Sequence, residues 1–247
     1  MRFLLISVLV LGTSAFPAVN FTLTVEMLNK MIEKIKTESQ YVPAYVMDQI
    51  NNATDAEKQQ FVDLMNRIYR GQFPVVSSTQ QFVETVEREA PLIGPKARAI
   101  YNNYMEHYNN LTAGAKQFIS TWENKWFTAM QSYSADRQAF FKNMIAMTKD
   151  LLTDIKVHQR LPYLELPSVT STSNAVLQNL NPETWASLKQ QFPEQVKAWE
   201  ECPQFKALRA FMDNLPRNSD LTKDPETLNK IMELGFKKYL PAEAIHA

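Results

Sequence analysis

The sequence predicts an all-α fold, organised as a single compact multi-helix domain, and three observations support this prediction. The 247 residues include only 5 glycines, and no segment sustains the alternation of apolar and polar residues that marks a strand. Apolar residues recur instead at helical spacing in successive segments. Ser, Thr, Asp or Asn also precedes many of these segments, and such side chains accept hydrogen bonds from the free N–H groups that open a helix.

Residues 1–15 are ordered as a secretory signal peptide, with Arg2 near the start, an apolar run, and small residues before a cut after Ala15. The apolar run holds about ten residues, whereas a membrane-spanning helix needs roughly twenty. No later segment of the sequence is apolar enough to span a bilayer. We therefore expect secretion to the extracellular space and a soluble mature protein, with Ala18 as a second candidate cut site.

Charge and cysteine content narrow the classes of partner. The sequence has 26 basic and 26 acidic residues and no clustered Lys/Arg run. This argues against nucleic acid as a partner and against stable docking on anionic membranes, and leaves only transient membrane contact open. The lone Cys202 cannot form an internal disulfide, so we expect it to be a small buried residue, with intermolecular pairing as the alternative. Nothing in the sequence indicates a stable oligomer.

The first predicted helices are recognised by how they start. An N-terminal extension, residues 16–38, holds one helix, and a short helix starts at Pro43. Thr54 and Glu57 form a capping box, in which each side chain satisfies the other residue's backbone N–H group. The helix that this box opens is predicted to end at Gly71.

The middle of the chain continues in the same way. Ser78 and Gln81 repeat the capping box, and Pro91 closes the helix that follows. A further helix is predicted over residues 95–109. Thr112 then caps a helix whose aromatic and aliphatic residues fall on one narrow stripe at 3.6 residues per turn.

A long helix over residues 134–158 is apolar around nearly half of its circumference, which is wider than one neighbouring helix needs. Residues 160–173 hold two prolines and a Ser/Thr cluster. We predict a surface crossing there, and a linker between domains is the alternative. Helices are predicted to resume at about Asn174, and Asn181-Pro182-Glu183-Thr184 then sets a further helix start. The C-terminal tail, residues 213–247, is predicted to hold one helix.

Three Asn-x-Ser/Thr sequons occur in the sequence. In an exported chain each is a candidate glycosylation site on an exposed loop. Their asparagines are Asn20, Asn52 and Asn110.

The sequence is poor in residues that carry chemistry. Three separated histidines and one cysteine give no ligand cluster for a metal. There is no Gly-x-Ser-x-Gly, no phosphate-binding glycine loop and no His-Glu-x-x-His. We expect no enzyme activity, no metal and no cofactor. A catalytic set can be scattered along a chain, so a hydrolase that uses His107 or His158 is kept as an alternative, although His107 is expected to be an ordinary surface residue.

Three sequence blocks, taken in order, resemble the nematode fatty-acid- and retinol-binding proteins. They are Tyr41-Val42-Pro43 with Thr54-Asp55-Ala56-Glu57-Lys58, the run Leu-Thr-Ala-Gly-Ala-Lys-Gln-Phe over 111–118, and Leu180-Asn181-Pro182-Glu183-Thr184 leading to Leu188 and Phe192-Pro193. The blocks lie within residues 39–212, which the resemblance identifies as a lipid-binding helical domain. The family often carries a kinase site near its first acidic cap. Thr54 would match it, but the capping box and the overlapping Asn52 sequon argue against phosphorylation.

The resemblance implies a secreted, all-helical carrier that binds fatty acids and retinol reversibly in an internal apolar cavity. Arg98 and Lys125 are the expected partners of a ligand carboxylate, because both stand at the edges of apolar stripes. The rival interpretation is a secreted helical protein-interaction module with a solid core and no lipid ligand. The residues expected to line the cavity are Leu64, Ile68, Phe82, Val86, Ile100, Tyr104, Phe118, Ile119, Trp122, Trp126, Phe140, Met144, Ile145, Leu151 and Leu152.

Overall fold

The computed structural model describes residues 22–131, 143, 147, 150, 182–214, 227 and 230. Its regular elements are helical, and no strand occurs among the described residues, so the predicted all-α class is confirmed. The elements are α2 Val25–Thr37, the 3-10 turn η1 Ser39–Tyr41, α3 Ala44–Asn51, α4 Asp55–Tyr69, α5 Thr79–Glu89, α6 Gly94–Asn109, α7 Ala113–Gln131, α10 Pro182–Gln191, α11 Pro193–Glu201 and α12 Pro203–Asp213.

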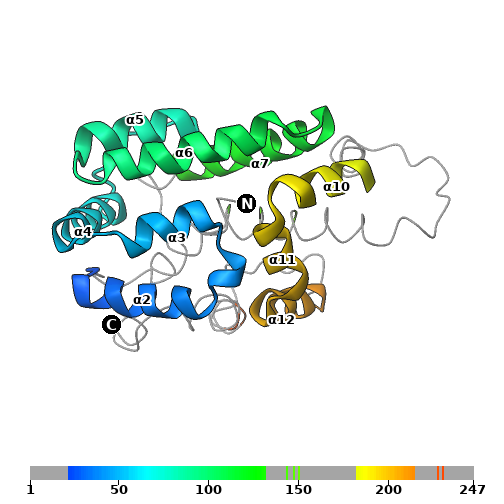
Figure 1. Ribbon diagram of the computed structural model, residues 1–247, viewed down its shortest axis with the longest axis horizontal. Coiled ribbons are helices and arrows are strands. Elements are labelled where there is room, and N and C mark those ends of the chain that lie inside the picture. The colour runs from blue at the N-terminus through cyan, green and yellow to red at the C-terminus, as the bar shows by residue number, and fades with distance from the viewer. Residues whose placement is uncertain are drawn as a thin grey trace.

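The helices form a layered arrangement (Figure 1). Helices α5, α6 and α7 run together along one side, α2 lies on the opposite side, and α3 and α4 lie between them. The three helices α10, α11 and α12 stand at one end. Of the helices that the structure describes, none is both long and apolar enough to cross a bilayer. The predicted signal peptide, most of the predicted long helix, the 160–173 crossing and most of the tail fall outside the described residues.

The helix starts and ends follow the predicted local chemistry. Thr54 and Glu57 form the complete capping box, with the Thr54 N–H donating to Glu57 Oε2 at 2.7 Å. At the other end of α4, Gly71 has a positive φ of 70°, its N–H donates to the Ile68 carbonyl, and the Gln72 N–H donates to the Arg67 carbonyl. These two bonds make a Schellman motif, which requires a left-handed residue that glycine supplies without strain.

The second predicted box is only half formed. Ser78 caps α5 by accepting from the Gln81 N–H at 3.1 Å. The Gln81 side chain does not return to Ser78, because its Oε1 accepts instead from the N–H and hydroxyl of Ser77. The prediction was therefore right about where α5 starts and wrong about the partner of Gln81.

One close approach fixes how α5 meets α6. A Cβ built on Gly94, the first residue of α6, would lie 2.8 Å from the Cα of Glu87 in α5. Since that atom belongs to the backbone, it cannot move aside as the end of a flexible side chain could. The sequence places glycine where two helices need to touch.

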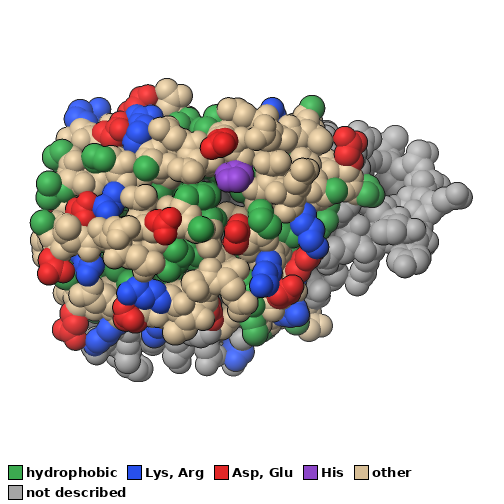
Figure 2. All heavy atoms as spheres, viewed as in Figure 1, with side chains coloured by type: hydrophobic (Ala, Val, Ile, Leu, Met, Phe, Trp, Pro, Cys, Tyr) green, Lys and Arg blue, Asp and Glu red, His purple; other side chains and the backbone are tan. Residues whose placement is uncertain are grey.

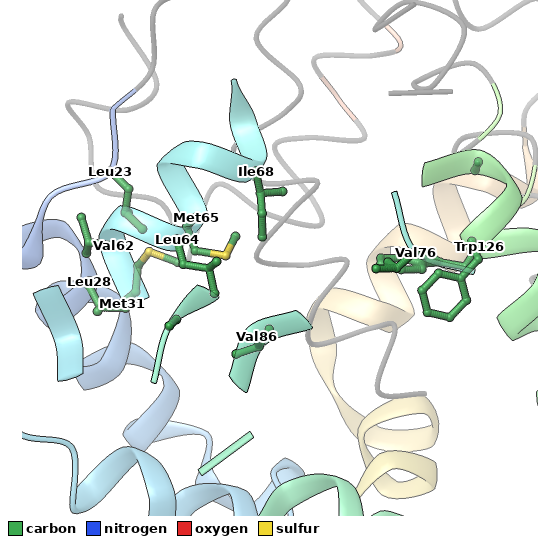
Figure 3. Packing of buried hydrophobic residues seen from close by; sticks show 13 residues of the cluster. Leu23, Leu28, Met31, Val62, Leu64, Met65, Ile68, Val76, Val86 and Trp126 are labelled. Atoms are coloured by element: carbon green, nitrogen blue, oxygen red, sulfur yellow. The ribbon is translucent and has the colours of Figure 1, made fainter. Parts of the chain in front are cut away.

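The apolar residues gather in two clusters. We call the first the α4 cluster; it joins α2, α4, α5 and the second half of α7, and Figure 3 shows its α2 and α4 side chains drawn together. We call the second the α11 cluster; it joins α6, the first half of α7, α10, α11 and α12. Met147 packs against both clusters. The predicted burial of Cys202 is confirmed, since it is 2% exposed and its thiol is free.

The N-terminal extension is part of the α4 cluster. Leu28 and Met31 of α2 are buried in it, although the sequence pattern did not single out Met31. Ahead of α2, the Asn66 side chain pairs with the backbone of Leu23 twice: its Oδ1 accepts from the Leu23 N–H at 2.8 Å, and its Nδ2 donates to the Leu23 carbonyl at 3.0 Å. This amide pair attaches the chain just ahead of α2 to the last turn of α4.

We expect Asn66→Ala to lower the free energy of unfolding by about 1–3 kcal/mol, because it leaves two partly buried backbone groups without partners. Asn103→Ala is the matched control: Asn103 donates only to the Ala99 carbonyl of its own helix, so the change should stay within about 0.5 kcal/mol. Urea unfolding of both variants measures the difference. Equal, small effects would show that the Asn66–Leu23 amide pair does not contribute to stability.

Candidate functional site

Helix α7 connects the two apolar clusters. Phe118, Ile119 and Trp122 of its first half belong to the α11 cluster, and Trp126 and Phe127 of its second half belong to the α4 cluster. The stripe predicted from spacing is therefore real, but its two halves pack against different neighbours. Met147 packs against both clusters. The α7–Met147 region is the candidate site for an elongated apolar ligand.

The predicted lining residues divide between these clusters. Leu64, Ile68, Val86 and Trp126 are buried in the α4 cluster, with Phe82 partly buried against it. Tyr104, Phe118, Ile119 and Trp122 are buried in the α11 cluster. Ile100 is half-buried and belongs to neither cluster. The five remaining predictions, Phe140, Met144, Ile145, Leu151 and Leu152, lie outside the described residues.

Sequence reasoning did not select three residues that the structure brings to the candidate region. Met147 lies on the wide apolar face predicted over residues 134–158, where spacing alone does not rank it against the selected Met144 and Ile145. Phe127 lies beside the stripe rather than on it, yet it is 3% exposed because α7 is enclosed on more than one side. Met31 is buried in the α4 cluster but belongs to the N-terminal extension, which lies outside the predicted lipid-binding range of residues 39–212.

The second and third sequence blocks meet at the start of α7. The Thr112 N–H donates to Ser187 Oγ at 3.0 Å, across 75 residues. Leu111 and Ala115 share the α11 cluster with Leu188 and Phe192. Residues of these two blocks therefore join α7 to α10 and α11.

Arg98 already has a carboxylate partner. Its Nε donates to Glu87 Oε1 at 2.8 Å, and its Nη2 bonds the other carboxylate oxygen, so the pair is bidentate. The hydrogen bonds and charge of Arg98 lower the pKa of Glu87, and the same hydrogen bonds raise the pKa of Arg98. A ligand carboxylate would have to displace a partner that fits the guanidinium well.

Lys125 has a looser environment. Its Nζ lies 4.3 Å from the centroid of the Trp122 ring, a cation–π arrangement, and 3.6 Å from Asp150 Oδ2. The Lys125 side chain is 38% exposed and that of Asp150 63%. An exposed ion pair at this distance contributes little, so the ammonium remains available to another anion.

Three polar atoms of the α11 region lack hydrogen bonds. Within the described part of the chain, Trp122 Nε1, Trp199 Nε1 and Gln195 Oε1 are buried without a hydrogen-bond partner. Trp122 is 6% exposed and Trp199 4%. Buried indole N–H groups ordinarily find an acceptor, so each of these positions is a place where a ligand atom or water would be stabilised.

His107 has aromatic partners on two other elements. It is half-buried and stacks on Tyr45 of α3, with ring centroids 6.0 Å apart, and its ring is tilted against that of Phe192, with centroids 5.9 Å apart. The ring therefore joins α3, α6 and the start of α11.

Among the described residues, no group of three His, Cys, Asp or Glu side chains is placed to hold a metal ion. Figure 2 shows basic and acidic side chains interspersed on the face in view, with apolar side chains between them.

The two described sequons are both at exposed positions. Asn52 follows α3 and Asn110 follows α6, and both residues are exposed. Asn20 lies outside the described residues.

Comparison with known proteins gives one match. Residues 38–211 match the model of the family described as nematode fatty acid retinoid binding protein (Gp-FAR-1), a family of binding proteins rather than enzymes. No curated protein and no solved structure matches the chain significantly. The matched range contains the described elements from η1 to α12 apart from the last residues of α12, and it includes the α7–Met147 region. The chain belongs to the nematode fatty acid retinoid binding protein family.

Proposed function

We propose that this protein is an extracellular lipid carrier that binds fatty acids and retinol reversibly in an internal apolar cavity, without catalysis. The observation that carries the proposal is the family match over residues 38–211. The aromatic and methionine side chains around α7 support it, because such side chains adapt to apolar ligands of different shapes.

The energetics of lipid burial suit a carrier. Burying a methylene group is worth about 0.8 kcal/mol, so a long-chain fatty acid has a gross ceiling on the order of 10 kcal/mol before the cost of association. A net binding free energy of about −8 kcal/mol corresponds to micromolar affinity. A protein with that affinity both loads and releases its ligand.

The proposed binding domain comprises residues 39–212, between the N-terminal extension of residues 16–38 and the tail of residues 213–247. Its cavity is proposed to lie along α7, between the α4 and α11 clusters, where Met147 contacts both. The predicted lining residues of α4, α5, α6 and α7 would then face one elongated ligand. Ile100, which belongs to neither cluster, is the weakest member of that set.

For the ligand carboxylate, Lys125 is the better of the two predicted partners. The bidentate bond to Glu87 occupies Arg98, whereas among the described residues the Lys125 ammonium has a single-oxygen ion pair with Asp150, at 3.6 Å, and lies over the Trp122 ring. A ligand carboxylate at Lys125 would replace the exposed Asp150 carboxylate as the partner of the ammonium. The acyl chain of the ligand would then enter beside Trp122. The signal-peptide layout of residues 1–15 supports secretion.

The decisive experiment measures displacement of a fluorescent fatty acid from delipidated protein by oleate and by retinol. We expect saturable displacement by both, in the micromolar range. Native mass spectrometry after gentle purification should also find retained lipid. A solid-cored interaction module would show no saturable binding in the first experiment and no lipid in the second.

Lys125→Gln should weaken oleate binding about three- to ten-fold and leave retinol nearly unchanged, because only the acid carries a charge. Arg98→Gln is the matched control, and we expect it to change neither affinity by as much, since its partner is Glu87. Both are measured by the same displacement assay. A larger loss for Arg98→Gln would assign the carboxylate to α6 instead.

Expression in a secretory eukaryotic host should give a product whose mass falls on treatment with peptide-N-glycosidase. Asn52→Gln and Asn110→Gln should each remove one glycan, because both asparagines are exposed at helix ends. An unchanged mass in either variant would show that its sequon is unused. Glycan at Asn52 would also stand close to Thr54 and hinder a kinase there.

A further inference from the structure

The indole N–H of Trp122 is a buried hydrogen-bond donor. Trp122 is 6% exposed, its Nε1 has no hydrogen-bond partner among the residues that the structure describes, and its neighbours in the α11 cluster are apolar. Leaving such a donor without an acceptor is destabilising, because it loses its hydrogen bond to water on burial. Such a group is usually satisfied by bound water or by a ligand.

A cation lies beside this donor. The Lys125 ammonium is 4.3 Å from the centroid of the same indole ring, one turn along α7. The two groups therefore present a neutral N–H and a positive charge within a few ångströms of each other, at the point where an apolar cluster meets an exposed side chain. A carboxylate has two oxygens, and one oxygen on each group would satisfy both.

We propose that Trp122 Nε1–H is the neutral hydrogen-bond donor for the polar head of a bound lipid. The donor serves both classes of ligand, because a carboxylate oxygen and a hydroxyl oxygen each accept from an uncharged N–H. Lys125 adds attraction for the acid alone. This inference rests on the proposed lipid-binding function and adds to it the residue that one site uses to accept both an acid and an alcohol.

Trp199 provides the matched comparison. Its Nε1 is also buried without a partner, and Arg209 lies over its ring with the guanidinium carbon 4.7 Å from the centroid. Trp199 is on α11, however, whereas Trp122 is on α7, the helix that runs through both clusters and contacts the candidate region. We assign the lipid head to Trp122 and leave the Trp199 donor to water.

The test uses three ligands with the same chain length and different heads: oleate, oleyl alcohol and 1-octadecene. Trp122→Phe, which keeps an aromatic ring, should weaken oleate and oleyl alcohol about five- to ten-fold and leave 1-octadecene unchanged. Lys125→Gln should weaken oleate alone, and Trp199→Phe should weaken none. Equal weakening of all three ligands by Trp122→Phe, or the same pattern from Trp199→Phe, would overturn the assignment.

A second measurement uses the unmodified sequence and so does not depend on how a variant folds. The chain has 4 tryptophans, so indole-¹⁵N labelling gives four N–H resonances to follow by NMR. The Trp122 resonance should move downfield with oleate and oleyl alcohol relative to its position with 1-octadecene. If all three ligands bind and this resonance does not distinguish them, the head-group assignment alone fails. If none of the three binds, the proposed carrier function fails with it.

Discussion

The packing of α7 is the constraint on which the rest of this fold depends. With a single cysteine there is no internal disulfide, so the helices are held by apolar contacts, and α7 supplies aromatic residues to both clusters. Phe118 and Trp122 pack toward α10 and α11, and Trp126 and Phe127 pack toward α2 and α4. Each cluster is thus completed by the same helix. A displacement of α7 along its axis would disturb both at once, which makes the helix a rigid support for whatever binds beside it.

The helix starts and ends that the sequence predicted correctly are set by interactions between residues close together in the chain. The Thr54–Glu57 box, the Gly71 end of α4 and the start of α10 at Pro182 each depend on residues a few positions apart, so their geometry can be read directly from the chain. The Asn66–Leu23 pair joins residues 43 apart and the Thr112–Ser187 bond residues 75 apart, and no local pattern marks either. Helical spacing likewise found the α7 stripe but gave no sign that its halves serve two clusters.

Arg98 and Lys125 show why position on a helix does not decide a role. Both are cations at the edge of an apolar stripe, and by spacing alone they are equivalent. Glu87 gives Arg98 a bidentate partner, and their hydrogen bonds lower the pKa of the Glu87 carboxyl. Lys125 instead lies over an indole ring and forms an exposed ion pair with Asp150 at 3.6 Å. The carboxylate that pairs with each cation comes from a different part of the chain: Glu87 lies on α5, and Asp150 follows α7 in the sequence. Only the folded arrangement shows which charge is already satisfied.

The N-terminal extension helps to complete the core of the family fold in this chain. Helix α2 lies ahead of residue 38, where the family match starts, yet Leu28 and Met31 are buried among residues of α4 and α5. Those α4 and α5 surfaces are apolar and would otherwise face water. A site built on the α4 cluster therefore has α2 as one of its walls, held in place by the Asn66 amide. Because the extension and the matched domain share one core, a change in α2 would reach the proposed site through the packing of Leu64 and Ile68.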